Sequence, residues 1–203
     1  MKWAWALVLS LLIVVAGVEI AGYFLPSRLD VEREAVIAAP VDSLYAKVAD
    51  LQGWEEWSPI LAIGDDLETG VAFLGPPSGL GAQMEVRFGD VLKVLFTVVE
   101  AEEPIRFALN SRSGDPSDDL LAGSGFEGWD EFDLEALDAS RTRVRWRRTS
   151  SEVDSYWLRV IDTVAAKPQV ASQLEAGLVA LAKACGAPDP EVTEPEPERA
   201  SGD

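Results

Sequence analysis

The chain has 203 residues, with 35 acidic against 17 basic side chains and a formal net charge of −18. A body this acidic repels phosphate backbones, so no nucleic-acid partner is expected. The absence of histidine excludes histidine acid–base catalysis, Ser-His-Asp and Cys-His nucleophiles and most transition-metal sites.

The N-terminal segment is an apolar run over residues 3–25 with one ionisable side chain, Glu19. A helix of this length covers the roughly 30 Å hydrocarbon core of a bilayer. Aromatic side chains at both ends suit the headgroup regions, and Pro26 ends the helix. We predict a transmembrane anchor and short linker over residues 1–28, which contacts the lipid bilayer through residues 3–25. A cleaved signal peptide is the alternative, but its apolar core is normally shorter and ends in a small-residue cleavage site.

The orientation of this anchor follows from the charges beside it. Lys2 precedes the apolar run, and Arg28 and Arg33 follow it, so the positive charges are almost balanced. A lysine directly before a long apolar run is typical of a signal-anchor, and the segment before it is too short to be a translocated domain. We expect a single-pass protein of the inner or plasma membrane, with its C-terminal domain on the non-cytoplasmic side.

A strand and two short helices are predicted after the linker. Apolar and polar residues alternate over residues 29–39, as in a half-buried strand. Pro40 ends this strand and opens a helix with an apolar stripe that includes Leu44 and Val48. A second short helix is expected over residues 52–57.

A succession of strands is predicted next, because apolar residues alternate with polar ones between turn signals. The expected strands cover residues 71–74, 82–88, 91–99, 105–110, 126–137 and 141–149. A loop rich in Gly, Ser and Asp is expected over residues 111–125.

The last two strands form a predicted hairpin with a tight turn at residues 138–140. This hairpin places three acids opposite three arginines on the solvent face: Glu131, Asp133 and Glu135 against Arg143, Arg145 and Arg147. Such cross-strand pairs contribute about 0.2–1 kcal/mol each. An arginine run can also bind phosphate or lipid headgroups, but the acids opposite favour structural pairing.

A long helix and a polar tail are predicted to end the chain. Apolar residues keep three- and four-residue spacing over residues 154–184, and Pro168 predicts a kink or a one-turn break. Residues 186–203 are acidic and rich in proline, which predicts disorder. One folded domain is therefore expected over residues 29–185.

Residues 31–60 contain a series of motifs at the ends of these predicted elements. They are Ala39-Pro40, Ala49-Asp50-Leu51 and Trp54-x-x-Trp57-Ser58-Pro59. The segment resembles the opening signature of the SRPBCC superfamily, in its polyketide cyclase/dehydrase-like branch. An anchor that ends in Phe-Leu-Pro just before the first strand also resembles a recurrent bacterial arrangement of this family.

The resemblance implies an α+β, START-like helix-grip fold. In this fold a curved antiparallel sheet wraps around a long C-terminal helix, here preceded by one transmembrane helix, and an apolar cavity lies between sheet and helix. Members bind lipids, sterols, polyketides and other hydrophobic molecules, and some catalyse cyclisation or dehydration. The Trp-x-x-Trp-Ser-Pro segment marks the fold and is not a catalytic motif, and a fold alone does not define a function.

Large apolar side chains predicted to face the space between sheet and helix are the candidate cavity-lining, ligand-binding residues. They are Met84, Phe88, Phe96, Phe107, Phe132, Trp146 and Trp157. An ordinary filled core is the alternative for each of them. Tyr45, Asn110 and Tyr156 are candidate polar groups at the cavity mouth. No catalytic residue, cofactor or metal site is predicted.

The leading hypothesis is a non-enzymatic, membrane-tethered binding domain for a hydrophobic small molecule or lipid. One alternative is a cyclase/dehydratase-type enzyme that works through a Tyr, Asp, Glu or Arg of perturbed pKa in the cavity. Another is a structural or protein-interaction module whose acidic tail recruits a basic partner. The identity of the ligand and the oligomeric state stay open.

Overall fold

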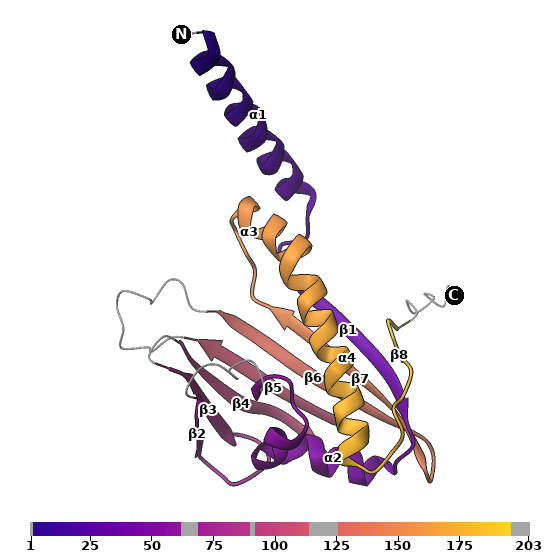
Figure 1. The fold of residues 1–203 in the computed structure, drawn as a ribbon. Helices are drawn as coiled ribbons and strands as arrows, with labels where there is room; N and C mark the ends of the chain where they lie inside the picture. The colour runs from indigo at the N-terminus through magenta and orange to yellow at the C-terminus, as the bar shows by residue number, and fades with distance from the viewer. Residues whose placement is uncertain (1, 62–68, 90–91, 114–125, 196–203) are drawn as a thin grey trace, which may run out of the picture.

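The computed structural model describes residues 2–61, 69–89, 92–113 and 126–195. Its strands form one twisted antiparallel sheet with the order β2-β3-β4-β5-β6-β7-β1-β8, and helix α4 lies across one face of it (Figure 1). The strands are β1 Asp30–Ile37, β2 Thr69–Leu74, β3 Gln83–Phe88, β4 Leu92–Glu102, β5 Arg106–Ser113, β6 Glu127–Asp138, β7 Arg141–Ser150 and β8 Val192–Thr193. This is the predicted α+β architecture, a large antiparallel sheet with a C-terminal helix.

The helices lie on one side of the sheet, except for the first, which projects away from it (Figure 1). They are α1 Lys2–Phe24, α2 Val41–Ala49, the 3-10 helix η1 Leu51–Glu56, α3 Tyr156–Ile161, the π-helix η3 Asp162–Ala166 and α4 Lys167–Ala184. Within the described residues, no helix combines the length and the hydropathy needed to cross a bilayer. Residues 3–25 lie in α1 and the turn that follows it, and the transmembrane anchor stays a prediction.

The segment from α2 to η1 owes its shape to local hydrogen bonds. The Asp50 carboxylate accepts the backbone N–H of Gln52 at 3.1 Å and so caps η1. The indole N–H of Trp54 donates to the carbonyl oxygen of Val48 at 2.8 Å. These contacts hold the fully buried Trp54 ring against Phe132, with 6.2 Å between ring centroids. In this structure the motifs of residues 31–60 therefore stabilise the fold by packing in the core.

The predicted hairpin of β6 and β7 is confirmed in its register. Glu131 lies opposite Arg147, Asp133 opposite Arg145, and Glu135 opposite Arg143. The ion pairs of the three arginines follow a different pattern: Arg143 with both Glu135 and Glu34, Arg145 with Glu34 at 2.7 Å, and Arg147 with Asp30 at 2.6 Å. All three thus have a partner on β1, and for Arg145 and Arg147 it is the only ion-pair partner among the described residues, because β1 pairs with the other edge of β7. A hairpin pattern cannot reveal a strand that joins from a hundred residues away.

The long C-terminal helix departs from regular α geometry just before Pro168. The backbone N–H of Lys167 donates to the carbonyl oxygen of Asp162, five residues earlier, as in a π-helix. Proline has no N–H to donate and its ring crowds the carbonyl four residues earlier. A widened turn relieves this crowding and leaves α3, η3 and α4 as one continuous helical segment, so the irregularity takes the form of a π-turn.

The tail differs from the predicted disorder where the structure describes it. Val192 and Thr193 form β8, opposite Ala35 and Glu34 of β1. An edge strand has unpaired backbone donors and acceptors that any extended segment can satisfy, whatever its composition. Residues 196–203 and most of the predicted loop over 111–125 lie outside the described residues.

Candidate ligand-binding site

An open groove of about 760 Å³ lies between the sheet and the α3–η3–α4 segment. Phe88 of β3 and Leu92, Val94 and Phe96 of β4 contribute apolar side chains to its lining. These side chains line one face because β3 and β4 pair antiparallel and alternate residues of each strand face the helix.

The helical wall of the groove has a regular spacing. Leu158, Asp162, Ala166 and Val170 all line the groove and follow one another at intervals of four residues. Residues four apart lie on one face of a helix, and the π-turn does not break this face. The wall therefore runs from α3 through η3 into α4. Residues 150–155, from the end of β7 to the start of α3, also line the groove.

The seven candidate residues separate into three groups. Phe88 and Phe96 line the groove. Four are buried in the packed core, namely Met84, Phe107, Phe132 and Trp146, each with 0% exposure. Trp157 lies on α3 with 41% of its surface exposed. Whether any of the seven contacts a ligand stays a prediction.

Aromatic side chains from β5, β6, β7 and the end of η1 pack together and fill part of the space between sheet and helix. The rings of Phe132 and Trp146 stack with their centroids 4.7 Å apart, and Trp57 contacts both, at 6.2 and 5.9 Å. The two tryptophans of the opening signature thus occupy space between sheet and helix that the sequence alone left open. None of these three rings lines the groove.

The candidate mouth residues have other roles in the structure. Tyr45 is buried with its ring against Phe107, and burial raises the pKa of its hydroxyl above the ordinary value. The Asn110 amide donates to the Glu127 carboxylate at 3.2 Å and to the carbonyl oxygen of Gly128 at 3.3 Å. Tyr156 packs against α1, beside Tyr23.

A buried polar network beside the groove was missed by the sequence analysis. The Asp130 carboxylate accepts the Trp146 indole N–H at 2.8 Å and the Nε–H of Arg148 at 2.7 Å. Arg148 also donates from Nη1 to Gln173 of α4 at 3.3 Å. Strand alternation could have revealed these residues, because side chains two positions apart point to the same face of a sheet. Arg148 is two residues from the inward-facing Trp146, and Asp130 is two residues from Phe132.

Asp162 is the titratable side chain of the helical wall. Burial raises the pKa of its carboxyl above the ordinary value of 3.8, because the charged form is partly desolvated. A carboxyl group of this kind in a groove is a candidate acid or base. In the part of the chain that the structure describes, no cluster of His, Cys, Asp and Glu side chains is placed to hold a metal ion.

Replacing Asp162 by asparagine is expected to raise the melting temperature at neutral pH. A carboxyl with a raised folded-state pKa contributes most below its unfolded pKa, and stability is lost as pH rises through the folded pKa. The difference in melting temperature between the variant and the wild type should therefore disappear as the pH falls toward 4. Asp154→Asn, at an exposed groove residue, controls for the lost charge in thermal melts at several pH values. An unchanged gap at low pH would contradict the assigned cause.

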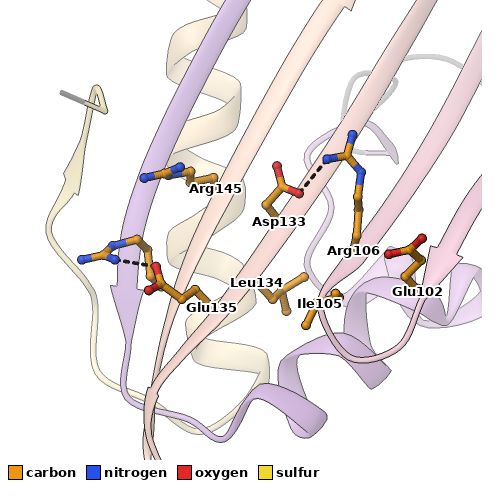
Figure 2. A pocket seen from close by; sticks show the side chains of 8 residues that line it. Glu102, Ile105, Arg106, Asp133, Leu134, Glu135 and Arg145 are labelled. Carbon is orange, nitrogen blue, oxygen red and sulfur yellow. Dashed lines mark hydrogen bonds and ion pairs between the residues drawn. The ribbon is translucent and has the colours of Figure 1, made fainter. Parts of the chain in front are cut away.

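A smaller pocket of about 340 Å³ lies on the outer face of the sheet (Figure 2). Most of its charged side chains are already paired: Arg106 with Asp133 at 3.1 Å, Arg143 with Glu135, and Arg145 with Glu34. A hydrogen bond from Arg106 to Glu100 raises the pKa of the guanidinium further. Because these charges neutralise one another, the outer pocket has the character of a surface ion-pair network, and the inner groove is the stronger candidate site.

Comparison with known proteins identifies related sequences and folds. A family model described as "Polyketide cyclase / dehydrase and lipid transport" matches residues 28–186. No curated protein matches the sequence.

Three solved structures share the fold at low sequence identity. A solution structure from Thermobifida fusca is 17% identical with a TM-score of 0.52, covering 78% of this chain and 93% of that chain. Norcoclaurine synthase from Thalictrum flavum, in complex with dopamine and hydroxybenzaldehyde, is 13% identical with a TM-score of 0.53, covering 81% and 90%. A conserved protein from Geobacillus kaustophilus is 10% identical with a TM-score of 0.56, covering 82% and 100%. At these identities the likeness supports the fold alone.

Proposed function

Since the chain belongs to the polyketide cyclase/dehydrase and lipid transport family, we propose that residues 29–185 form a binding domain for a hydrophobic small molecule or lipid. The supporting observation is the groove of about 760 Å³ with Phe88 and Phe96 in its lining. Ligand pockets commonly have volumes of about 300–1,000 Å³ and mostly apolar walls with a few polar groups. The groove has both properties.

The proposal includes a membrane tether over residues 3–25, with the domain on the non-cytoplasmic side. It rests on the apolar sequence of this segment, and on the exposure of large side chains such as Leu12, Ile13 and Ile20 on α1. Side chains of this kind are stable when they face lipid. A fusion after Asp203 tests the orientation: alkaline phosphatase activity supports it, and fluorescence from a cytoplasm-only reporter contradicts it.

The junction between α1 and the domain would keep the groove close to the bilayer. The backbone N–H of Val153 donates to the carbonyl oxygen of Ser27 at 2.7 Å, and the N–H of Leu29 donates to the Ser150 hydroxyl at 3.1 Å. Leu29, Ser150 and Val153 all line the groove. The tether and the groove wall are therefore joined without a flexible spacer, so a ligand could exchange with the membrane over a short path.

Filling the groove is the direct test. Ala166→Trp places an indole at the helical wall and should lower the affinity for long-chain ligands at least roughly tenfold, because overpacked sites reject their ligand. Ala165→Trp is the matched control, since Ala165 is exposed and does not line the groove. Native mass spectrometry of the full chain, released from detergent micelles, measures ligand occupancy. Equal occupancy in both variants, or none in the wild type, would contradict the proposal.

A second candidate function is catalysis of the cyclase or dehydratase kind. The observation that favours it is Asp162, whose carboxyl lines the groove with a raised pKa. A carboxyl group in a binding groove can act as a general acid or base toward a bound substrate. Asp162→Asn would then abolish turnover of a bound hydrophobic substrate while binding persisted, whereas a pure binding domain would show no turnover in either form.

A further inference from the structure

We propose that Arg148 is the polar anchor of this groove, and that its ligands are long-chain amphiphiles with an oxygen acceptor in the head group. A carboxylate and an ester carbonyl share this chemistry. The inference rests on the proposed binding function and names the ligand class of the same site. Its basis is the geometry of the guanidinium, which lines the groove.

The Arg148 guanidinium is held in place from three directions. Nε donates to Asp130 at 2.7 Å, and Nη1 donates to Gln173 at 3.3 Å. The cationic carbon lies 5.6 Å from the centroid of the Trp146 ring. The side chain is 11% exposed, against 3% for the Asp130 side chain. A donor fixed in this way loses little conformational entropy when a ligand binds.

One nitrogen of this guanidinium has no hydrogen-bond partner among the described residues. Nη2 is buried, and the described residues offer it no hydrogen-bond acceptor. A guanidinium carries only donors, and a buried donor without an acceptor is costly. Arg148 lines the groove, so a small shift of its side chain would bring the buried Nη2 within reach of an acceptor oxygen on a bound ligand. An ammonium group cannot, because it too carries only donors.

Charge along the groove sets the direction of the ligand. Asp162 lies in the helical wall about three helical turns before Gln173, and Glu152 and Asp154 also line the groove. These carboxylates repel an anionic head, whereas Arg148, although its charge is paired with Asp130, keeps Nη2 as an unsatisfied donor. The apolar side chains of the groove suit a long acyl chain. The head group is therefore placed at Arg148 and the chain along the floor toward α3.

The test compares three ligands that differ only in their head group. Native mass spectrometry of the full chain in detergent measures the affinities of dodecanoic acid, methyl dodecanoate and dodecylamine. The acid or the ester should bind roughly tenfold tighter than the amine, the size of one hydrogen bond to a charged donor. Tight binding of the acid alone identifies a carboxylate ligand, and tight binding of both shows that a carbonyl suffices.

Variants of Arg148 locate the preference. Arg148→Met should lower the affinities for the acid and the ester to that for the amine. If this variant does not fold, Arg148→Lys is measured instead, because it keeps a positive charge beside Asp130. Arg147→Met is the matched control, because Arg147 is the neighbouring residue, exposed and paired with Asp30. The control should keep the wild-type preference.

The outcomes separate this inference from the proposed function. Equal affinities for the three ligands in the wild type, as when only water occupies Nη2, overturn the inference and leave the binding function standing. Tightest binding of the amine overturns it in favour of a cationic ligand. A preference that survives undiminished in Arg148→Met overturns the role of Arg148. No binding of any of the three overturns the binding function itself.

Discussion

Asp130→Ala is expected to lower the free energy of unfolding by about 3–5 kcal/mol, because it leaves the Arg148 charge buried without its counterion. It also removes the acceptor of the Trp146 indole N–H, which lies 2.8 Å from the carboxylate. Asp130 is 2% exposed, so water cannot replace the lost acceptor without a change in packing. Chemical denaturation monitored by tryptophan fluorescence measures the loss.

A control on the same strand separates burial from charge. Asp133→Ala removes a carboxylate that pairs with Arg106 at 3.1 Å, but its side chain is 49% exposed. Exposed pairs are worth about 0–1 kcal/mol. In the double variant Asp130→Ala with Arg148→Met, the loss should be smaller than the sum of the two single losses, since no unpaired charge remains. Equal losses at Asp130 and Asp133 would refute the importance of burial.

Gly177→Val is expected to destabilise the fold by about 2–3 kcal/mol, through overpacking where α4 crosses β7. A Cβ atom at this position would lie 2.3 Å from the Trp146 ring and 3.0 Å from the Pro59 ring. The Trp146 ring cannot yield easily, because it is fully buried and stacked on Phe132. The glycine is therefore required for close approach of helix and sheet.

The matched control lies one residue earlier on the helix. Ala176 is exposed, so Ala176→Val reports the effect of a β-branched residue on the helix alone, roughly 0.7 kcal/mol or less. Thermal and chemical denaturation of both variants give the comparison. If Gly177→Val were no more destabilising than the control, α4 would not pack against the sheet as closely as described.

Part of the binding site could be predicted from the sequence. Phe88 and Phe96 were assigned to the inner face from strand alternation, and both line the groove. The same rule applied to Asp130 and Arg148 would have placed two opposite charges on that face. The ion pair between them could be recognised only in the structure. Strand alternation shows that two residues share a face of the sheet, but not that their side chains are in contact.

The sequence by itself determined the strands β1 to β7, the register of the β6–β7 hairpin and the family. The resemblance over residues 31–60 predicted the family, and the match over residues 28–186 confirms it. These properties depend on alternation, turn chemistry and local motifs, which neighbouring residues encode. Only the tertiary structure decided which aromatic side chains close the interior and which leave a groove, and that β1 supplies partners to Arg145 and Arg147. The reason is physical: packing and ion pairing depend on distances between residues far apart in the chain, and a one-dimensional pattern holds no information on those distances.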